Sequence, residues 1–216
     1  MTENIIEIIK EDGSRQIVSS IPGVSLNFHG VNNHIIVHEG TKFTKCEFIL
    51  ISNMAIEIGK SNYGIVNLKI FGTHSDVIIG NNFSCWGVEI RCHEKNTSVS
   101  IGDDCLFSED ILIYPTDVHT VYDLDTGKIL NLGEPIKIGN HVWCNRDVKI
   151  LKGSLIGSNV VITSNSLVIK NKIDDINNVI IGGIPAKILK RNINWSRESP
   201  FHYYTKQKNH EKDIHR

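Results

Sequence analysis

Apolar residues recur with a period of six in the second half of the chain. From Ile138 to Val168 every sixth position is aliphatic or small and apolar, and the position four residues further on is small or β-branched. An amphipathic helix would need spacings of three and four, and a half-exposed strand would need alternation, so neither structure fits. A period of six predicts short strands separated by corners, with three strands closing a triangular coil around the repeated side chains. The repeated side chains are Ile138, Cys144, Ile150, Ile156, Ile162 and Val168, and the second set is Val142, Val148, Ser154, Val160 and Ser166.

A looser form of this pattern occupies the first half of the chain. Similar segments open at Val37, Ile58, Ile79 and Ile101, at intervals of 21 or 22 residues, which indicates coils lengthened at one corner. Stacked coils of this kind form an all-β solenoid with strands about 4.8 Å apart and need capped ends. We therefore predict an N-terminal cap in residues 1–30, one β-helix domain in residues 31–188 and a C-terminal tail in residues 189–216.

A polar run interrupts the coils. Residues 116–135 read "TDVHTVYDLDTGKILNLGEP", and the periodic pattern resumes at Ile136 or Ile138. We predict a loop that leaves the wall of the solenoid here. A wall of packed strands offers few concave sites, whereas a projecting loop creates one, and this loop carries His119 near its start.

Composition narrows the class of protein. With 216 residues and 40% hydrophobic content the chain can bury a sizeable core as one domain, and its net charge of −1 gives no reason to expect a nucleic acid as partner. Charges interrupt the N-terminal segment and no apolar run approaches about 20 residues, so we expect a cytoplasmic protein without a transmembrane segment. The five cysteines lack CxxC spacing. We interpret them as reduced structural thiols, with metal or disulfide chemistry as the alternative, and expect no metal site.

Six short motifs carry a family resemblance. In order they are "TDVH", "TGKILN", "IGNHVW", "ILKG", "GIPAKI" and "NINW", all between residues 99 and 197. Together with the hexapeptide repeat they resemble the left-handed parallel β-helix acyltransferases that use acetyl-CoA, in particular the O-acetyltransferases of bacterial capsule and other surface polysaccharides, including polysialic acid. The resemblance implies an acetyl-CoA-dependent O-acetyltransferase and a homotrimer with its active site between two subunits.

The resemblance assigns the catalytic base to His119. Transfer of an acetyl group to a sugar hydroxyl needs a base, and an imidazole titrating near neutral pH is suited to this role. Asp117 or a nearby backbone carbonyl would hold the ring in the right tautomer. The alternative for His119 is a solvated loop histidine. His141 is the rival base, although its place in the repeat indicates an outward-facing corner.

Trp143 is the third candidate catalytic residue. The resemblance places it beside the acetyl group, with its backbone N–H as an oxyanion donor and its ring as a wall of the acceptor site. The alternative is a packing residue at a corner of the coil.

The resemblance places the coenzyme on the last coils and the segment after them. Glycine permits close backbone approach and cations bind phosphate, whereas the alternatives are a coil-ending turn with a solvated basic segment and serines that serve the repeat alone. Asn145 stands where the family usually has glycine, and "TSNS" replaces Gly-Ala pairs, which would reshape the groove for the pantetheine arm. The candidate residues are Asn145, Ser164, Ser166, Gly183, Pro185, Ala186, Lys187, Lys190 and Arg191.

The acceptor is the least determined part of the function. Trp86, Arg91 and His93, from the region outside the resemblance, are our candidate acceptor-binding residues. Acceptors other than a surface polysaccharide include a nucleotide sugar, a small saccharide or an antibiotic, with N- or O-acetylation as the reaction. A non-catalytic β-helix scaffold is the third hypothesis, and the intact "TDVH", "HVW" and "GIPAK" motifs argue against it.

Overall fold

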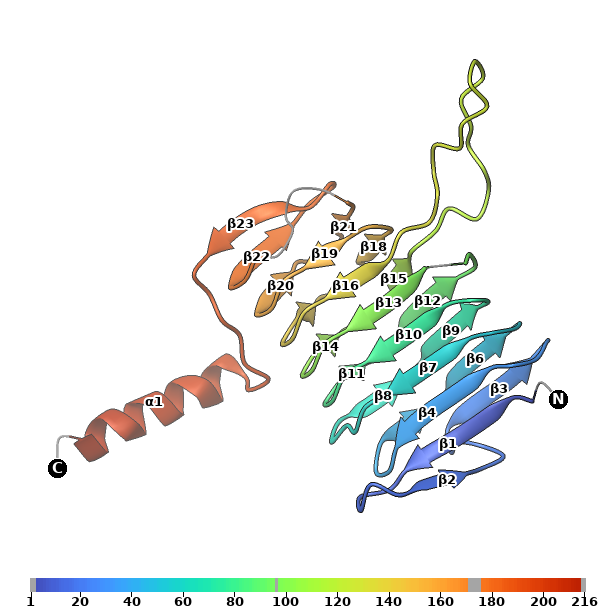
Figure 1. Ribbon diagram of the computed structural model, residues 1–216. Coiled ribbons are helices and arrows are strands. Elements are labelled where there is room, and N and C mark those ends of the chain that lie inside the picture. Colours follow the sequence, from blue (N-terminus) through green and yellow to red (C-terminus); the bar gives the residue numbers. More distant parts are fainter. Residues whose placement is uncertain (1–2, 96, 171–175, 215–216) are drawn as a thin grey trace.

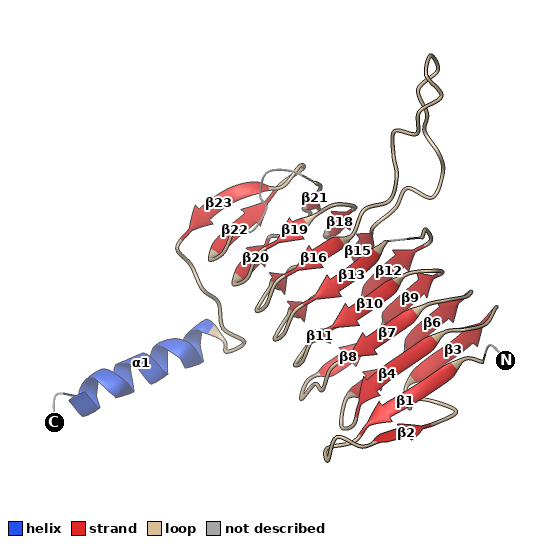
Figure 2. Ribbon diagram, in the orientation of Figure 1, coloured by secondary structure: helices blue, strands red, loops and turns tan. Residues whose placement is uncertain are grey.

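The protein folds into a three-sided solenoid of parallel β-strands (Figure 1). The computed structural model describes residues 3–95, 97–170 and 176–214. Almost all of its regular structure is strand, with one helix near the C-terminus (Figure 2). The strands form three sheets, which we number in the order in which the chain visits them within one coil. The 1–2, 2–3 and 3–1 corners are the turns between successive sheets.

The strand boundaries follow the coil order. Sheet 1 contains β1 (Ile5–Ile9), β4 (His34–His38), β7 (Ala55–Ile58), β10 (Asp76–Ile79), β13 (Ser98–Ile101), β16 (Ile136–Ile138) and β19 (Leu155–Ile156), with β2 (Arg15–Ile17) at its edge. Sheet 2 contains β5 (Lys42–Thr44), β8 (Gly64–Val66), β11 (Ser84–Cys85), β14 (Leu106–Phe107), β17 (Trp143–Cys144), β20 (Val160–Ile162) and β22 (Val179–Gly182), with β23 (Lys187–Arg191) at its edge. Sheet 3 contains β3 (Val24–Phe28), β6 (Cys46–Leu50), β9 (Leu68–Gly72), β12 (Val88–Cys92), β15 (Ile111–Tyr114), β18 (Lys149–Leu151) and β21 (Leu167–Val168).

The predicted period of six is confirmed by burial. Every residue of both predicted sets, from Ile138 to Val168, is at most 6% exposed and points into the solenoid. Rows of Ile and Val stack from coil to coil, and full burial of each such side chain contributes about 1.5–3 kcal/mol. The core is therefore a continuous column, as the sequence predicted.

Residues with left-handed backbone make the 1–2 corner. Successive coils place Asn82, Asp104, His141, Asn159 and Asn178 there, all with φ between 54° and 58°. Asn, Asp and His tolerate this region better than most residues, which explains their recurrence at the corner. His141 therefore faces outward, as predicted.

The N-terminal end of the stack differs from the cap predicted for residues 1–30. β1 pairs in parallel with β4, and β3 pairs with β6, so the parallel stack begins within residues 1–30. From residue 3 onward, β2 is the one strand added antiparallel at this end. The reason is that "IIEII" and "VSLNF" form five-residue strands that pair in register with β4 and β6 of the next coil.

The C-terminal tail leaves the last coil in steps. β23 pairs antiparallel with β22, residues 192–199 then run back along the solenoid, and α1 (Pro200–Ile214) projects away from it (Figure 1). No helix in the described part of the chain is long and apolar enough to cross a membrane.

All five cysteines lie inside the solenoid as free thiols. Burial raises the pKa of Cys92 and of Cys105 to about 12, so these thiols stay protonated and unreactive near neutral pH. Their role is packing, in agreement with the structural interpretation.

Candidate active site

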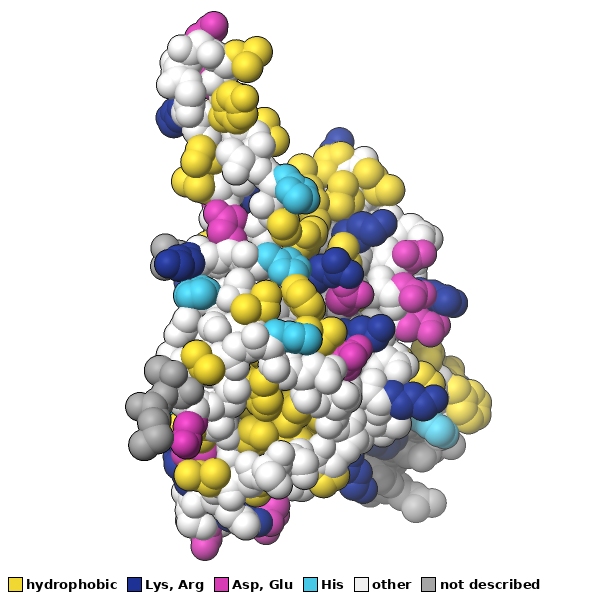
Figure 3. All heavy atoms as spheres, turned by 90° about the vertical axis from the view of Figure 1, so that its right-hand side faces the viewer, with side chains coloured by type: hydrophobic (Ala, Val, Ile, Leu, Met, Phe, Trp, Pro, Cys, Tyr) yellow, Lys and Arg dark blue, Asp and Glu magenta, His cyan; other side chains and the backbone are white. Residues whose placement is uncertain are grey.

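The polar loop leaves the solenoid at the 3–1 corner. It departs after β15, returns at β16 and projects beyond the coils with hydrophobic side chains along its length (Figures 1 and 3). Figure 3 also shows histidine side chains gathered below the base of the loop. The loop therefore forms a raised edge next to one corner of the solenoid.

A partly buried cluster of hydrogen bonds closes the neck of the loop. One carboxylate oxygen of Glu94 accepts hydrogen bonds from the hydroxyl of Thr116 (2.6 Å) and from the backbone N–H of Gly133 (3.1 Å). The hydroxyl of Thr116, only 1% exposed as a residue, also accepts from the N–H of Val118 (3.0 Å). The neck is closed on the backbone by the N–H of Glu134, which donates to Pro115 O (2.9 Å). Glu94 thus joins the outgoing and returning strands of the loop.

Asp117 fixes the loop with its side chain instead of orienting the imidazole. Its carboxylate contacts the ammonium of Lys152 and accepts from Asn131 Nδ2 (3.1 Å), and Lys152 is the main cause of its lowered pKa. Asp117 touches His119 through backbone, since the His119 N–H donates to Asp117 O (2.7 Å). The Asp117 carboxylate makes no contact with the His119 ring in this arrangement, since Lys152 and Asn131 both contact its Oδ2 and hold the side chain within the loop.

The imidazole of His119 is exposed and open to a substrate. Its backbone is held by the Asp117 contact and by Asn131, whose Nδ2 donates to His119 O (2.8 Å), while its ring has no hydrogen-bond partner among the described residues. It borders a hollow of about 100 Å³ that Glu94 and Leu132 also line. A fixed backbone with an unpaired ring suits a side chain that accepts a proton from another molecule.

His93 lies next to the base of the loop. Its ring centroid is 4.5 Å from that of Phe71 and 6.3 Å from that of Tyr114, the last residue of β15. Burial, followed by the charge of Arg91, lowers the pKa of His93. His93 is therefore neutral near pH 7.

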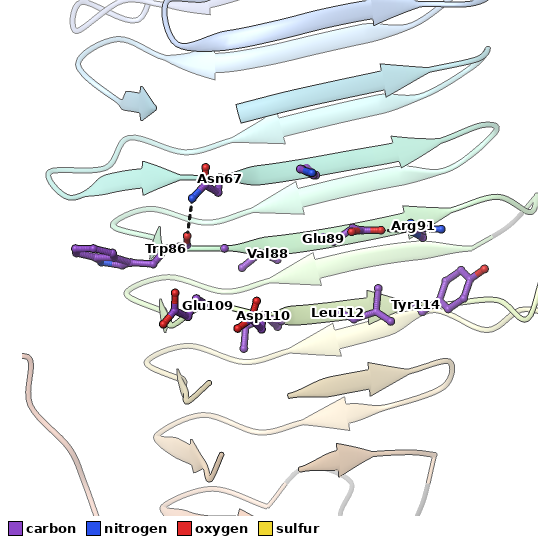
Figure 4. A pocket seen from close by; sticks show the side chains of 12 residues that line it. Asn67, Trp86, Val88, Glu89, Arg91, Glu109, Asp110, Leu112 and Tyr114 are labelled. Atoms are coloured by element: carbon purple, nitrogen blue, oxygen red, sulfur yellow. Dashed lines mark hydrogen bonds and ion pairs between the residues drawn. The ribbon is translucent and has the colours of Figure 1, made fainter. Parts of the chain in front are cut away.

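Trp86 and Arg91 share a groove on sheet 3, as the sequence analysis grouped them (Figure 4). The groove has a volume of about 610 Å³ and follows the outer faces of β12 and β15. Trp86 stands at the 2–3 corner, and Arg91 and Tyr114 lie toward the 3–1 corner. His93 lies just beyond the groove, against Tyr114.

Trp143 lies at the 1–2 corner beside an aromatic stack. Its ring centroid is 5.9 Å from that of Trp195, which in turn stacks on His141 at 4.1 Å with an interplanar angle of 11°. Trp195 belongs to residues 192–199, which we call the strap. The strap gives Trp143 a second aromatic wall that its own sheet does not supply.

His141 is engaged on both ring nitrogens. Nδ1 contacts the carboxylate of Asp104 (2.6 Å) and Nε2 contacts the carbonyl of Trp195 (3.1 Å). Both partners are acceptors, so neither nitrogen is left to take a proton from a substrate. Burial raises the pKa of Asp104, but hydrogen bonds from Arg197 and His141 outweigh it and hold the pKa below its ordinary value. His141 is a structural corner residue, and the rival base is thereby excluded in this arrangement.

Arg197 anchors the strap. Its guanidinium donates to Asp104 (2.8 Å), to the hydroxyl of Ser84 (2.8 Å) and to two backbone carbonyls on neighbouring coils (both 3.0 Å). It also lies over the ring of Tyr63 at 4.0 Å, and its side chain is only 17% exposed. The strap is therefore bound across several coils and is part of the folded body.

Known proteins resemble the chain in sequence, although no family model matches it. A polysialic acid O-acetyltransferase from Neisseria meningitidis is 36% identical, with 57% of this chain and 68% of the relative covered. The galactoside O-acetyltransferase of Escherichia coli strain K12 is 32% identical over 73% of this chain and 72% of the relative. The chain belongs to the hexapeptide-repeat acetyltransferase family. This confirms the resemblance and, at the level of the family, the enzyme class of acyltransferase.

Solved structures and a third relative extend the comparison. A polysialic acid O-acetyltransferase from Escherichia coli O1:K1 is 33% identical, but the match covers 57% of this chain and 39% of that relative, less than half its length. The crystal structure of the polysialic acid O-acetyltransferase OatWY superposes with a TM-score of 0.72 at 30% identity, covering 83% of this chain and 86% of that one. For the polysialic-acid-specific acetyltransferase NeuO the TM-score is 0.68 at 29% identity, covering 90% and 78%. The predicted left-handed parallel β-helix is confirmed.

The predicted coenzyme residues of this hexapeptide-repeat acetyltransferase chain fall into two groups. Lys187, Lys190 and Arg191 are exposed on β23 and, among the described residues, take part in no ion pair, so their charges are available to phosphate. Pro185 and Gly183 are exposed at the preceding turn, where Gly183 has φ of 99°. These positions fit the phosphate end of the coenzyme.

The second group is tied into the coils. Ser166 is 3% exposed; its hydroxyl donates to Thr163 O (2.6 Å) and accepts from the N–H of Gly183 (3.2 Å), so it serves the repeat, the alternative that the sequence left open. Ala186 is buried, and the Nδ2 of Asn145 donates to Ile162 O (2.9 Å). Ser164, by contrast, is exposed, and its predicted contact with pantetheine stays a prediction.

His119 and Trp143 lie at different corners of one chain. His119 follows β15 at the 3–1 corner, Trp143 opens β17 past the 1–2 corner, and sheet 1 lies between these corners. The sequence analysis missed Glu94, Lys152 and Arg197, which hold the loop and the strap. Their signals were weak, because a single acidic or basic residue in a polar corner resembles any solvated side chain.

Proposed function

We propose that the protein transfers an acetyl group from acetyl-CoA to a hydroxyl of a bacterial surface polysaccharide, with His119 as general base. The observation that carries the proposal is the unpaired, exposed imidazole of His119 on a loop whose neck is fixed by Glu94 and Asp117. The names of the relatives, which are O-acetyltransferases of polysialic acid and of galactosides, support an acetyl donor and a sugar acceptor.

Each residue has a defined task in this proposal. Acetyl-CoA supplies the acetyl group as a thioester. Lys187, Lys190 and Arg191 bind its phosphates, since their charges are exposed and unpaired among the described residues. An imidazole nitrogen of His119 takes the proton of the acceptor hydroxyl as that oxygen forms its bond to the acetyl group, and later returns the proton to the departing sulfur. Trp143 walls the acceptor site, with its backbone N–H as the oxyanion donor.

The separation of His119 and Trp143 within one chain supports a site shared between two subunits. We therefore expect a homotrimer in which the loop of one copy faces the 1–2 corner of the next. A His119→Ala chain and a Lys187→Ala, Lys190→Ala chain should then partly restore activity when combined in one oligomer. A doubly tagged mixed oligomer as inactive as its parents would place the whole site in one chain.

An acceptor panel tests the reaction itself. The purified full chain would be incubated with acetyl-CoA and polysaccharides, their oligomers, nucleotide sugars and monosaccharides, and the products weighed by mass spectrometry. We expect an increase of one acetyl group per modified residue on a polymeric acceptor, absent from the His119→Ala variant. Acetylation of nucleotide sugars alone would contradict the polysaccharide acceptor, and acetylation that survives His119→Ala would contradict the base.

A further inference from the structure

The groove on sheet 3 leads to the base of the loop. Trp86 marks one end and Tyr114 the other, two residues before Thr116 of the loop neck (Figure 4). At that end the ring of His93 lies against Tyr114, and Glu94, the next residue, lines the hollow of His119. A glycan lying along the groove would therefore present one of its units near His119.

Trp86 supplies an aromatic surface at the far end of the groove. It is 68% exposed, and its side chain projects away from the sheet (Figure 4). Its backbone is held by Asn67, whose Nδ2 donates to Trp86 O (3.1 Å), and by its own N–H, which donates to Ser108 O (3.2 Å). A large ring on a fixed backbone and free of core contacts is suited to packing against the apolar face of a sugar.

Both arginines at the groove are paired with carboxylates. Arg91 contacts Glu89, and Arg146, at the rim, lies 3.3 Å from Glu109 and 3.1 Å from Asp110. An adjoining hollow of about 300 Å³ continues the groove toward the N-terminal coils. The remaining charged residues are Lys69, which lines both spaces, and Glu47, which lines the hollow.

This charge balance bears on the kind of glycan that fits. Three cations face four carboxylates, so the groove has no positive excess. A polyanionic chain needs such an excess, because its own carboxylates repel those of the protein. Ion-paired carboxylates and guanidinium groups still accept from and donate to sugar hydroxyls, which are both donors and acceptors. The groove therefore matches an uncharged glycan.

We propose that the groove between Trp86 and Tyr114 binds an uncharged glycan segment, so that the acceptor is a neutral polysaccharide and not a polyanion such as the polysialic acid named for two of the relatives. This rests on the proposed function, since it concerns the acceptor of the same reaction.

The test compares acceptors and one groove variant. Wild-type protein would be assayed with acetyl-CoA and neutral glucans and galactans against polysialic acid of similar chain length, at low and at physiological salt. We expect turnover on a neutral polymer at least about 10-fold above that on polysialic acid. Trp86→Ala should raise the KM for the neutral polymer about 5- to 10-fold and leave the KM for acetyl-CoA unchanged, from the usual magnitude of an aromatic contact. Phe201→Ala, which removes an equally exposed aromatic from α1, is the matched control.

A second variant tests the charge argument in the opposite direction. Glu109→Gln combined with Asp110→Asn frees Arg146 from both ion pairs and gives the groove a positive excess, so the ratio of turnover on polysialic acid to turnover on a neutral polymer should rise several-fold above the wild-type ratio; an unchanged ratio would contradict the charge argument.

The outcomes separate this inference from the proposed function. His119-dependent acetylation of polysialic acid in preference to every neutral polymer would overturn the neutral groove and leave the acetyltransferase proposal intact. If no polymer is acetylated, the proposed function fails, and binding of neutral oligosaccharides, followed by Trp fluorescence, decides the groove. Equal affinity in wild-type and Trp86→Ala proteins would then refute it.

Discussion

Glu94 gives the sharpest test of how the solenoid controls the loop. Glu94→Ala removes both hydrogen bonds that join Thr116 to Gly133 across the neck. Hydrogen bonds to a charged group contribute about 1.5–3 kcal/mol each, and we take the lower value because Glu94 is partly exposed, which gives about 3 kcal/mol. The Lys152–Asp117 contact and the backbone hydrogen bond from Glu134 to Pro115 remain. The free-energy difference that favours the closed neck over the open one is therefore reduced and not abolished.

The expected result is a fall of about 10²-fold in the ratio of closed to open loops, since each 1.4 kcal/mol is a factor of ten in that ratio, and turnover should fall by up to the same factor as the open loop comes to predominate. Initial rates of acetyl transfer at saturating acetyl-CoA measure this directly. Hydrogen exchange at the Gly133 amide, which donates to Glu94, should become faster in parallel. Glu94→Gln keeps an acceptor in place and should lose less activity.

Glu57→Ala is the matched control, because Glu57 is an exposed carboxylate on sheet 1 with no hydrogen bond among the described residues. A Glu94→Ala protein with wild-type turnover and unchanged exchange at Gly133 would refute the view that the neck positions His119.

The remaining predictions concern the base, the coenzyme, the strap and the coils. His119→Ala should lower turnover at least about 10²-fold with acetyl-CoA affinity within a few-fold, because a base acts mainly in the transition state; initial rates and coenzyme binding measure the two effects. Lys187→Ala with Lys190→Ala should raise the KM for acetyl-CoA with little change in kcat, in steady-state kinetics. Arg197→Ala should release the strap and lower Tm by several degrees, since about 1 kcal/mol corresponds to about 2–4 °C at this size; thermal unfolding measures it. Gly102→Ala should lower Tm too, because its Cβ would lie 2.2 Å from a side-chain oxygen of the next coil.

Matched variants give controls for His119, for the two lysines and for Gly102. His29→Ala replaces an exposed histidine outside the loop, and Lys42→Ala and Lys137→Ala replace exposed lysines away from β23. Gly64→Ala adds a Cβ that would lie 3.9 Å from Cγ2 of Val66, an ordinary van der Waals distance. If His119→Ala, the double lysine variant or Gly102→Ala behaved like its control, the residue concerned would not have the role assigned to it.

The fold could be predicted because its information is local and repeated. Each six-residue unit buries the same two of its positions. The period of six in the sequence therefore corresponds directly to the burial pattern from Ile138 to Val168. The position of the loop follows from the same rule, since residues 116–135 break the period. The N-terminal boundary was placed too late because the first strands, in longer coils, carry the pattern less regularly.

The details of the site could not be predicted because they depend on contacts between distant residues. Glu94 meets Gly133 39 positions away, and Arg197 meets Ser84 113 positions away. Asp117 or a nearby backbone carbonyl was expected to orient the imidazole, but the Asp117 carboxylate contacts Lys152, 35 positions later, and not the ring. No short motif encodes such pairings, since they arise only when the coils stack.

The loop is inserted in such a way that the folding of the coils does not depend on it. Strands β13 and β16 pair directly, with Val99 opposite Ile136 and Ile101 opposite Ile138, although the loop lies between them in the sequence. The coil therefore keeps its register whatever the loop does, because the ladder is continuous beneath it. Variants within the loop should change turnover while leaving the solenoid intact, whereas Glu94, which lies in a coil and reaches into the loop, connects the two. A solenoid that carries its reactive side chain on an inserted loop can thus vary the loop without changing its core.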